Sequence, residues 1–150
     1  MAREKDSSQR SKTWLITGAS SGLGYALARF PNTALALTLD VTKPEHRTAA
    51  VEQAETRFGG IDVLVNNAGI DFLGAIEEQD ERDYRNLFEV NFLAAVALLR
   101  MVLPGMRARK RGTIVNVSSM DGIASLPVNG YYSSSKFALE GLTERGTRPR

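Results

Sequence analysis

The chain has 150 residues, of which 43% are hydrophobic and 24% are charged, and this is the profile of one soluble globular domain. It contains no cysteine and a single histidine, His46, which excludes disulfide frameworks, thiol catalysis and a histidine-rich metal site. The net charge of +2 comes from the two ends, because residues 1–12 hold four basic and two acidic groups and residues 145–150 hold three arginines. The body between the ends is net acidic, so nucleic acid is a poor candidate partner.

We expect residues 1–12 to form a disordered polar tail and residues 145–150 a basic tail, with residues 13–144 as the one domain. The first twelve residues lack the apolar stretch of a secretory signal. The longest uninterrupted apolar run, Phe92–Leu99, is too short to span a bilayer. A cytoplasmic protein that binds no membrane is therefore the expectation.

Short β-rich runs alternate with longer helical patterns, which is typical of a parallel sheet with crossover helices. Four short apolar runs are the expected strands: Thr13–Thr17, Ala34–Leu39, Ile61–Val65 and Thr113–Val117. The pattern predicts an α/β fold of the Rossmann-like kind, a three-layer sandwich with a mostly parallel sheet of about four strands.

Four helices are expected, over Leu23–Phe30, from Thr42 to Phe58, from Asp80 to about Leu103 and from about Tyr131 to Glu144. Pro31 and Pro104 are expected to stop the first and the third, since proline disrupts a helix interior. Thr42 and Glu45 have the spacing of a capping box, with Asp80 as the cap of the third helix.

A glycine-rich turn, TGASSGLG at Thr17–Gly24, joins the first expected strand to the first expected helix. Glycines at 18, 22 and 24 allow a tight turn and let the backbone approach a pyrophosphate, which the N–H groups of the turn can bind. A plain glycine-rich turn is the alternative, although the strand–turn–helix context favours cofactor binding.

Tyr132 and Lys136 are four residues apart on an expected helix, so they share one face. An ammonium beside a phenol favours the phenolate, and the pair is a plausible proton donor and acceptor for interconverting an alcohol and a carbonyl. Coincidence is the alternative for this spacing alone. Tyr131 has the wrong spacing to Lys136 for the same role.

Two further polar positions stand out. Ser118 and Ser119 follow the last expected strand, where ligands bind in open α/β sheets, although serine there commonly serves as a turn or cap. Asn91 falls inside the apolar stripe of the long helix, so its amide must find hydrogen-bond partners. A purely structural role explains Asn91 equally well, and His46 is interpreted as a surface residue.

Together these residues resemble the short-chain dehydrogenase/reductase family over Thr13 to about Glu144. TGASSGLG resembles the family's cofactor loop, Asp40-Val41-Thr42 its adenine-contact segment, and Asn66-Asn67-Ala68-Gly69 its motif after the next strand. Asn91, Ser119, Tyr132 and Lys136 match the family's catalytic four in type and order. The resemblance implies a nicotinamide cofactor held by Gly18, Ser20, Ser21, Gly22, Leu23, Gly24, Asp40, Val41, Asn67, Ala68, Gly69, Tyr132 and Lys136, and no metal.

The resemblance also implies roles for the four. Ser119 would hold the substrate oxygen, and Tyr132 would give or take the hydroxyl proton. Lys136 would favour the phenolate and bind the nicotinamide ribose, while Asn91 would hold a water in a proton relay. The expected reaction is the interconversion of a small-molecule alcohol and a carbonyl with NAD or NADP.

The sequence departs from the family pattern in two places. A strand and a helix that the family has before its DVT segment are missing, because Asp40 follows Gly24 by only sixteen residues. If Ala34–Leu39 lies beside the first strand, Asp40 takes the position of the ribose-binding acid, which predicts a preference for NAD. The family's part beyond the catalytic helix is also missing, so a free edge strand is expected.

Three hypotheses follow. The chain is an NAD(P)-dependent oxidoreductase; or it is a shortened relative without turnover that binds nucleotide weakly or pairs with a full-length partner; or it has no stable fold. The long helices over residues 80–103 and 131–144 are the candidate surface for a homo-oligomer.

Overall fold

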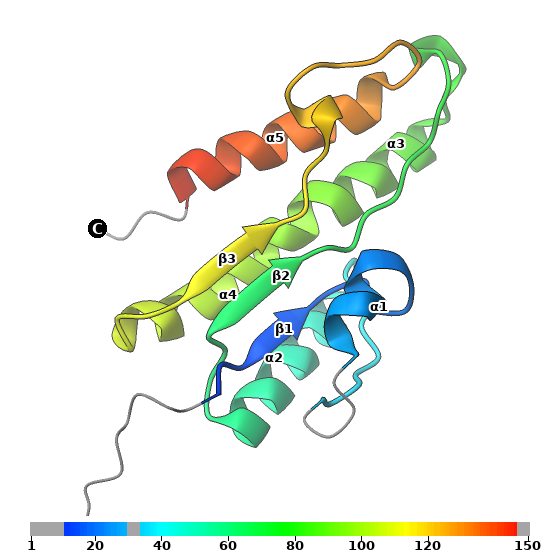
Figure 1. Ribbon diagram of the computed structural model, residues 1–150. Coiled ribbons are helices and arrows are strands. Elements are labelled where there is room, and N and C mark those ends of the chain that lie inside the picture. Colours follow the sequence, from blue (N-terminus) through cyan, green and yellow to red (C-terminus); the bar gives the residue numbers. More distant parts are fainter. Residues whose placement is uncertain (1–10, 30–33, 147–150) are drawn as a thin grey trace, which may run out of the picture.

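Three strands form a parallel sheet in a computed structural model that describes residues 11–29 and 34–146. They are β1 (Trp14–Ile16), β2 (Val63–Asn66) and β3 (Thr113–Asn116), in the order β1-β2-β3. All three arrowheads in Figure 1 point toward the same end of the molecule. The α/β fold class and the parallel sheet are as predicted from the sequence. The two expected tails fall mostly outside the described residues.

The register separates the sheet into an inner and an outer face. Leu15, Leu64 and Ile114 lie side by side in the three strands, and because side chains alternate along a strand they share one face. Leu64 is fully buried there, whereas the opposite face carries Trp14, which is 52% exposed, and Val115, which is 39% exposed. The inner face is therefore covered across the sheet, and the outer face is bare at both edges.

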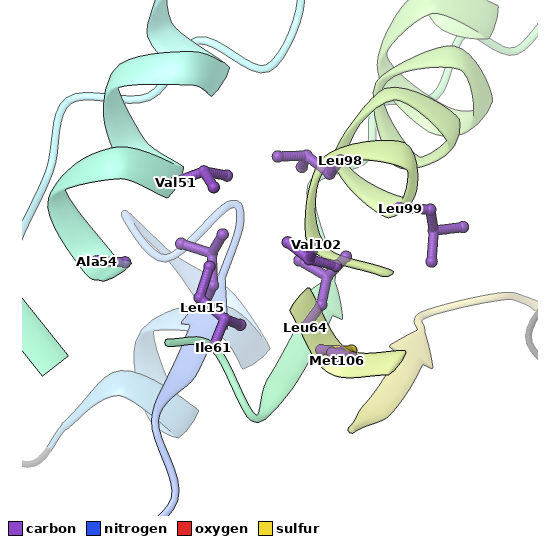
Figure 2. Packing of buried hydrophobic residues seen from close by; sticks show 9 residues of the cluster. All are labelled: Leu15, Val51, Ala54, Ile61, Leu64, Leu98, Leu99, Val102 and Met106. Atoms are coloured by element: carbon purple, nitrogen blue, oxygen red, sulfur yellow. The ribbon is translucent and has the colours of Figure 1, made fainter. Parts of the chain in front are cut away.

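The hydrophobic core lies between the inner face and two helices, α2 (Pro44–Phe58) and α4 (Ala94–Ala108). Figure 2 shows Val51 and Ala54 of α2 and Leu98 of α4 pointing toward the strands from the same side. Burying a leucine-sized side chain stabilises a fold by about 1.5–3 kcal/mol. The cluster consists of Leu15, Val51, Ala54, Ile61, Leu64, Leu98, Leu99, Val102 and Met106.

The expected strand over Ala34–Leu39 is wrong. Residues 34–40 form no strand, and the β1 edge of the described sheet has no further neighbour. A strand needs a partner ladder to satisfy its backbone N–H and C=O groups. An apolar run of this length cannot show by itself whether such a partner exists, so the sheet has three strands where about four were expected.

Helix α2 begins one residue later than the expected cap. Its N-cap is Lys43, with Pro44 in the first turn, and it ends at Phe58 with Gly59 in the left-handed conformation, as predicted. The Thr42 hydroxyl donates to Asp40 Oδ1 at 2.7 Å instead of capping the helix. Because Lys43 is the N-cap, Thr42 lies outside the helix, so the capping-box prediction is wrong.

The expected long helix is continuous from Glu81 to Ala108, but Pro104 does not stop it. It consists of α3 (Glu81–Phe88), a π-helical stretch η3 (Glu89–Leu93) and α4. Proline in a helix interior costs about 3 kcal/mol, yet the turns on both sides of Pro104 bury Val102 and Met106 in the core. This burial offsets the cost, so the helix continues to Ala108.

Among the described residues, this composite helix is the one long and apolar enough to cross a membrane by length and composition. Its Leu98, Leu99 and Val102 are buried against the sheet. A core helix of a globular domain passes the same length test, and that is how this helix packs.

The remaining elements follow the strands. Helix α1 (Gly22–Ala28) is shorter than the expected helix over Leu23–Phe30, whose last residue, like Pro31, lies outside the described residues. Short 3-10 turns, η2 (Ile76–Glu78) and η4 (Met120–Gly122), precede α3 and α5 (Gly130–Gly146). In Figure 1 the segments after β2 and after β3 run to the same end and meet beside the start of α5.

Candidate active site

The glycine-rich turn after β1 is tightly constrained at two of its glycines. Gly18 has a φ of 65°, a conformation that side chains rarely adopt, and a Cβ there would lie 2.8 Å from the Ala68 Cα. A Cβ on Gly24 would overlap the Gly18 carbonyl oxygen and lie 2.5 Å from Asn67 Nδ2. Only glycine fits at these two positions, so the turn packs closely on the segment after β2.

Thr17 and Asn67 hold that packing together. Thr17 Oγ1 accepts from the backbone N–H groups of Asn67 and Ala68, both at 3.0 Å. The Asn67 amide nitrogen donates to the carbonyl oxygens of Thr17 at 3.0 Å and Gly18 at 3.2 Å. The turns after β1 and β2 therefore form one unit at the carboxyl ends of the strands, where α/β proteins bind their ligands.

The outer part of the same turn is open. Gly22 has a φ of 55° and nothing within 4 Å of a Cβ built on it. Ser20, Ser21 and Leu23 are exposed. The turn is therefore closely packed on its inner side and uncrowded at Gly22 on its outer side. This arrangement fits a dinucleotide whose pyrophosphate approaches the backbone N–H groups of the turn.

Tyr132 and Lys136 both lie on α5, and the structure brings them together. Lys136 Nζ lies 5.5 Å from the centroid of the Tyr132 ring and donates to the Val117 carbonyl at 2.9 Å. Lys136 is 4% exposed while Tyr132 is half-buried. Burial lowers the pKa of the Lys136 ammonium from 10.5, and the Asp71 carboxylate partly opposes this. The ammonium is thus held beside the Tyr132 ring by a part-buried hydrogen bond.

Asn91 connects the segment after β2 to α5. Its amide oxygen accepts from the Ile70 N–H at 2.9 Å, and its nitrogen donates to the Ile70 carbonyl at 2.9 Å and to Ser135 Oγ at 3.1 Å. Ser135 Oγ in turn donates to the Tyr132 carbonyl at 2.7 Å. The buried amide therefore has the hydrogen-bond partners expected of it, from the middle of a π-helical stretch, a feature frequent at functional sites.

Gly69 stands where Asn91 and Lys136 converge. A Cβ on Gly69 would lie 3.4 Å from Asn91 Oδ1 and 3.7 Å from Lys136 Nζ. Three segments distant in sequence, namely the turn after β2, the π-helical stretch and α5, thus meet in one corner.

Ser119 lies at the carboxyl end of β3 and serves as the N-cap of η4, accepting from the Asp121 N–H at 3.2 Å. Its own hydroxyl hydrogen remains available to a ligand. Ser118 Oγ is buried without a hydrogen-bond partner among the described residues. A Cβ on Gly122 would lie 2.8 Å from Ser118 Oγ and 3.2 Å from Lys136 Cβ, so η4 rests on α5 beside the lysine.

Asp40 and Val41 have local roles here. The Asp40 carboxylate accepts from the Thr42 N–H at 2.9 Å and from its hydroxyl, and the side-chain hydrogen bond from Thr42, with its N–H, holds the Asp40 pKa below its usual range. Val41 is buried, and the half-buried His46 accepts from the Asp40 N–H at 3.2 Å. The preference for NAD assumed a strand beside β1, and that premise is wrong.

Two connecting residues were missed from the sequence. Ser135 is 0% exposed and links Asn91 to Tyr132, yet it stands in a run of three serines that gives no reason to choose one. Its position three residues after Tyr132, on the same helix face, is the signal that could have found it. In the sequence Thr17 is simply the last residue of an expected strand, although a threonine before a glycine turn can bind the neighbouring turn.

A family model described as short chain dehydrogenase matches residues 29–148. The chain belongs to this family. A solved structure of a short-chain dehydrogenase from Streptomyces avermitilis superposes with a TM-score of 0.86 at 39% identity, over 91% of this chain and 60% of that one. The family and the Rossmann-like fold predicted from the motifs are therefore confirmed.

Three curated relatives show how far the similarity extends. A 3-ketodihydrosphingosine reductase from Bacteroides thetaiotaomicron is 39% identical over 87% of this chain and 55% of its own length. A 3-alpha-(or 20-beta)-hydroxysteroid dehydrogenase from Mycobacterium bovis is 42% identical over 71% and 41%. Retinol dehydrogenase 8 from Homo sapiens is 35% identical over 89% and 52%. The chain spans about half the length of these relatives.

Proposed function

We propose that the chain is an NAD(P)-dependent oxidoreductase that interconverts an alcohol and a carbonyl. The observation that carries this proposal is the placement of the Lys136 ammonium 5.5 Å from the centroid of the Tyr132 ring, in the corner formed with Asn91 and Gly69. The relatives' names support an oxidoreductase but specify three different substrates, so only the reaction class is carried over from them.

Each side chain has a role that its contacts allow. Tyr132 gives its phenolic proton to a carbonyl oxygen, or takes the hydroxyl proton in the reverse direction. Lys136, held by the Val117 carbonyl, lies beside the Tyr132 ring and would bind the nicotinamide ribose. Ser119 donates its free hydroxyl hydrogen to the substrate oxygen. Asn91 holds the segment after β2 against α5 and has one amide lone pair left for a water in a proton relay.

The cofactor residues are those of the two joined turns. Gly18, Ser20, Ser21, Gly22, Leu23 and Gly24 would hold the pyrophosphate side, and Asp40, Val41, Asn67, Ala68 and Gly69 the adenine and nicotinamide sides. When bound, the dinucleotide supplies the hydride donor or acceptor. We propose either NAD or NADP, because the preference for NAD assumed a strand beside β1 that the described residues do not form.

The second candidate is a relative without turnover that binds nucleotide weakly or pairs with a full-length partner. The bare outer face at Trp14 and Val115 favours it, because a second chain could cover that face. We further propose a cytoplasmic location. We also propose a homo-oligomer through the helices over residues 80–103 and 131–144, and sedimentation velocity of the purified chain would detect this oligomer.

The first experiment is thermal unfolding with and without NADH and NADPH, followed by NAD(P)H oxidation with a panel of carbonyls. A ligand that binds only the folded state raises the midpoint, so a shift by one cofactor identifies it. A cooperative transition that neither cofactor moves, with no oxidation, would favour the second candidate.

Tyr132→Phe tests the mechanism within that assay. We expect turnover to fall by at least about a hundredfold, the lower end of a general acid's contribution, with the cofactor shift unchanged. Tyr131→Phe is the matched control, because its ring stacks on Tyr84 at 4.5 Å, away from Lys136. Turnover that survives the loss of the Tyr132 hydroxyl contradicts the mechanism.

A further inference from the structure

Two asparagines lie on the inner face of the sheet, directly beyond the apolar row of Leu15, Leu64 and Ile114. Asn66 and Asn116 are paired in the neighbouring strands β2 and β3. Each stands two residues after a member of the apolar row, so both side chains point to the inner face. Asn66 is buried and Asn116 is half-buried. Buried amides must form hydrogen bonds to offset the loss of water, so their partners show what these side chains hold together.

The hydrogen bonds of the two asparagines lead to the second half of α5. Asn66 Nδ2 donates to Asn116 Oδ1 at 2.8 Å. Asn116 Nδ2 donates to Thr143 Oγ1 at 2.9 Å, and Thr143 Oγ1 donates to the Leu139 carbonyl one turn earlier in α5, at 2.7 Å. Side chains thus connect β2, β3 and α5 in one series of hydrogen bonds.

This series has a single direction. A hydroxyl has one hydrogen, and Thr143 gives it to the Leu139 carbonyl, so toward the sheet Thr143 can only accept. Asn116 must then turn its Nδ2 to Thr143 and its Oδ1 to Asn66. Hydrogen bonds aligned in this way polarise and strengthen one another. The connection therefore requires a hydroxyl at position 143.

Two contacts fix α5 against the end of β3. Lys136 Nζ donates to the carbonyl of Val117, the residue after Asn116, and Thr143 accepts from Asn116 itself. Lys136 and Thr143 are about two turns apart, which is about 10 Å along one face of a helix. A helix held at one point can pivot, whereas two contacts at this separation fix its direction.

We propose that Thr143 and Asn116 are positioning residues, which set the direction of α5 so that the Tyr132 hydroxyl stands correctly relative to Ser119. Ser119 follows β3, in which Asn116 lies, and Tyr132 lies on the same helix as Thr143. The link therefore joins the two elements that present the reacting groups. This rests on the proposed function, in which both hydroxyls contact the substrate oxygen.

Thr143→Val tests the link, because valine has the shape of threonine without the hydroxyl. We expect kcat for NAD(P)H oxidation with a carbonyl to fall about tenfold to a hundredfold, since a misplacement of about 1 Å can cost about a hundredfold. KM for the cofactor should stay unchanged, because most of the proposed cofactor residues lie on the β1 side. Thr143→Ser keeps the hydroxyl and should restore kcat.

Thr48→Val is the matched control. Thr48 Oγ1 also donates to a carbonyl one turn earlier, that of Pro44 at 3.1 Å, but it is exposed and lies on α2. This variant removes the same kind of hydroxyl from another helix, so kcat should not change. An equal fall of kcat in Thr48→Val and Thr143→Val would contradict a special role for position 143.

A double-mutant cycle shows whether the two positioning residues act through one contact. Asn116→Ala removes the link from the strand, and Asn116→Ala/Thr143→Val should lose no more kcat than the more impaired single variant, because residues in one contact are non-additive. If the two fold-losses multiply in the double variant, the residues act separately and the proposal is wrong. Asn116→Ala carries all measurements if Thr143→Val does not fold.

Lys136 gives a readout that needs no turnover. It is 4% exposed and held by the Val117 carbonyl, so reductive methylation of the folded chain, followed by mass spectrometry, should modify it slowly. Thr143→Val should raise the methylation rate of Lys136 at temperatures well below the unfolding midpoint, because α5 then pivots and exposes the ammonium. The exposed Lys43 should react at the same rate in all variants.

The two proposals fail in different ways. If the unchanged chain oxidises neither NADH nor NADPH, the proposed function is wrong, and the methylation rate of Lys136 in Thr143→Val still decides whether Thr143 positions α5. In an active chain, an unchanged kcat in Thr143→Val overturns the positioning role and leaves the oxidoreductase standing. A lower unfolding midpoint with kcat and methylation as in Thr48→Val would show a role in stability alone, which also overturns the positioning role.

Discussion

The α5 side and the β1 side of this chain are held together by different means. On the α5 side, buried polar side chains connect segments distant in sequence, as Asn91 does between Ile70 and Ser135. On the β1 side, hydrogen bonds between Thr17 and Asn67 are joined by close backbone packing at Gly18 and Gly24, and the outer face is bare at Trp14. The proposed catalytic residues lie on the first side, and most of the proposed cofactor residues lie on the second.

The difference shows what each half needs in order to function. A proton-transfer group must be held in one orientation, and a satisfied network of buried hydrogen bonds does this. A dinucleotide turn needs room for the ligand against the backbone, which glycine provides. The α5 side is therefore sensitive to the loss of a polar group, and the β1 side to the addition of one carbon atom.

The largest expected effect is on the α5 side. Asn91→Ala leaves the Ile70 N–H and carbonyl without partners and removes the donor to Ser135. Each buried polar group left unpaired costs about 1–3 kcal/mol, so we expect the free energy of unfolding to fall by about 3 kcal/mol in urea titrations. Asn86→Ala on α3 is the control, because Asn86 is exposed. A similar fall in its free energy of unfolding would show that the hydrogen bonds of Asn91 contribute no more than an exposed amide does.

A slightly smaller effect is expected on the β1 side. Gly24→Ala places a Cβ against the Gly18 carbonyl and Asn67, and crowding by one carbon in a packed site costs about 1–3 kcal/mol. We expect a loss of about 2 kcal/mol together with loss of the NAD(P)H-dependent shift in midpoint.

Gly141→Ala on α5 is the matched glycine, because nothing lies within 4 Å of its Cβ position. Alanine should raise the unfolding free energy there by about 0.5–1 kcal/mol. Equal losses at the two glycines would remove the distinction between the two sides.

The smallest effect is a pH dependence confined to the α5 side. The pKa of Lys136 is lowered from 10.5 by burial, so between that lowered pKa and 10.5 the unfolded chain binds more protons than the folded one. Unfolding free energy then rises with pH across this window. Lys136→Met should remove the rise, and the exposed Lys43→Met should keep it, in urea titrations from pH 8 to pH 10. If the unfolding free energy of Lys136→Met still rises with pH, the rise is caused by another titratable group.

The sequence predicts the α5 side better because its information is local. The four-residue spacing of Tyr132 and Lys136 places both on one helix face wherever the helix lies. Asn91 interrupts an apolar stripe, which identifies a buried amide. Ser135 could not be singled out, because its importance depends on Asn91, which is 44 residues away.

The errors elsewhere arise where an outcome depends on neighbours that a short window does not contain. The run Ala34–Leu39 is apolar enough for a strand but has no sheet edge beside it. Pro104 is a helix breaker by local rules, yet core burial of Val102 and Met106 carries the helix past it. The ribose role suggested for Asp40 assumed that Ala34–Leu39 lies in the sheet beside β1, and that strand does not form.

The exposed Trp14 has a consequence for spectroscopy. It is the single tryptophan in the sequence and lies in β1, so the intrinsic fluorescence of the chain reports the environment of that edge strand. Far-UV circular dichroism, in contrast, is dominated by the long helices, including Glu81–Ala108 and α5. If the β1 side opens before the helices melt, the two signals will not coincide. The separation between the two curves would then measure how strongly the β1 side is coupled to the α5 side.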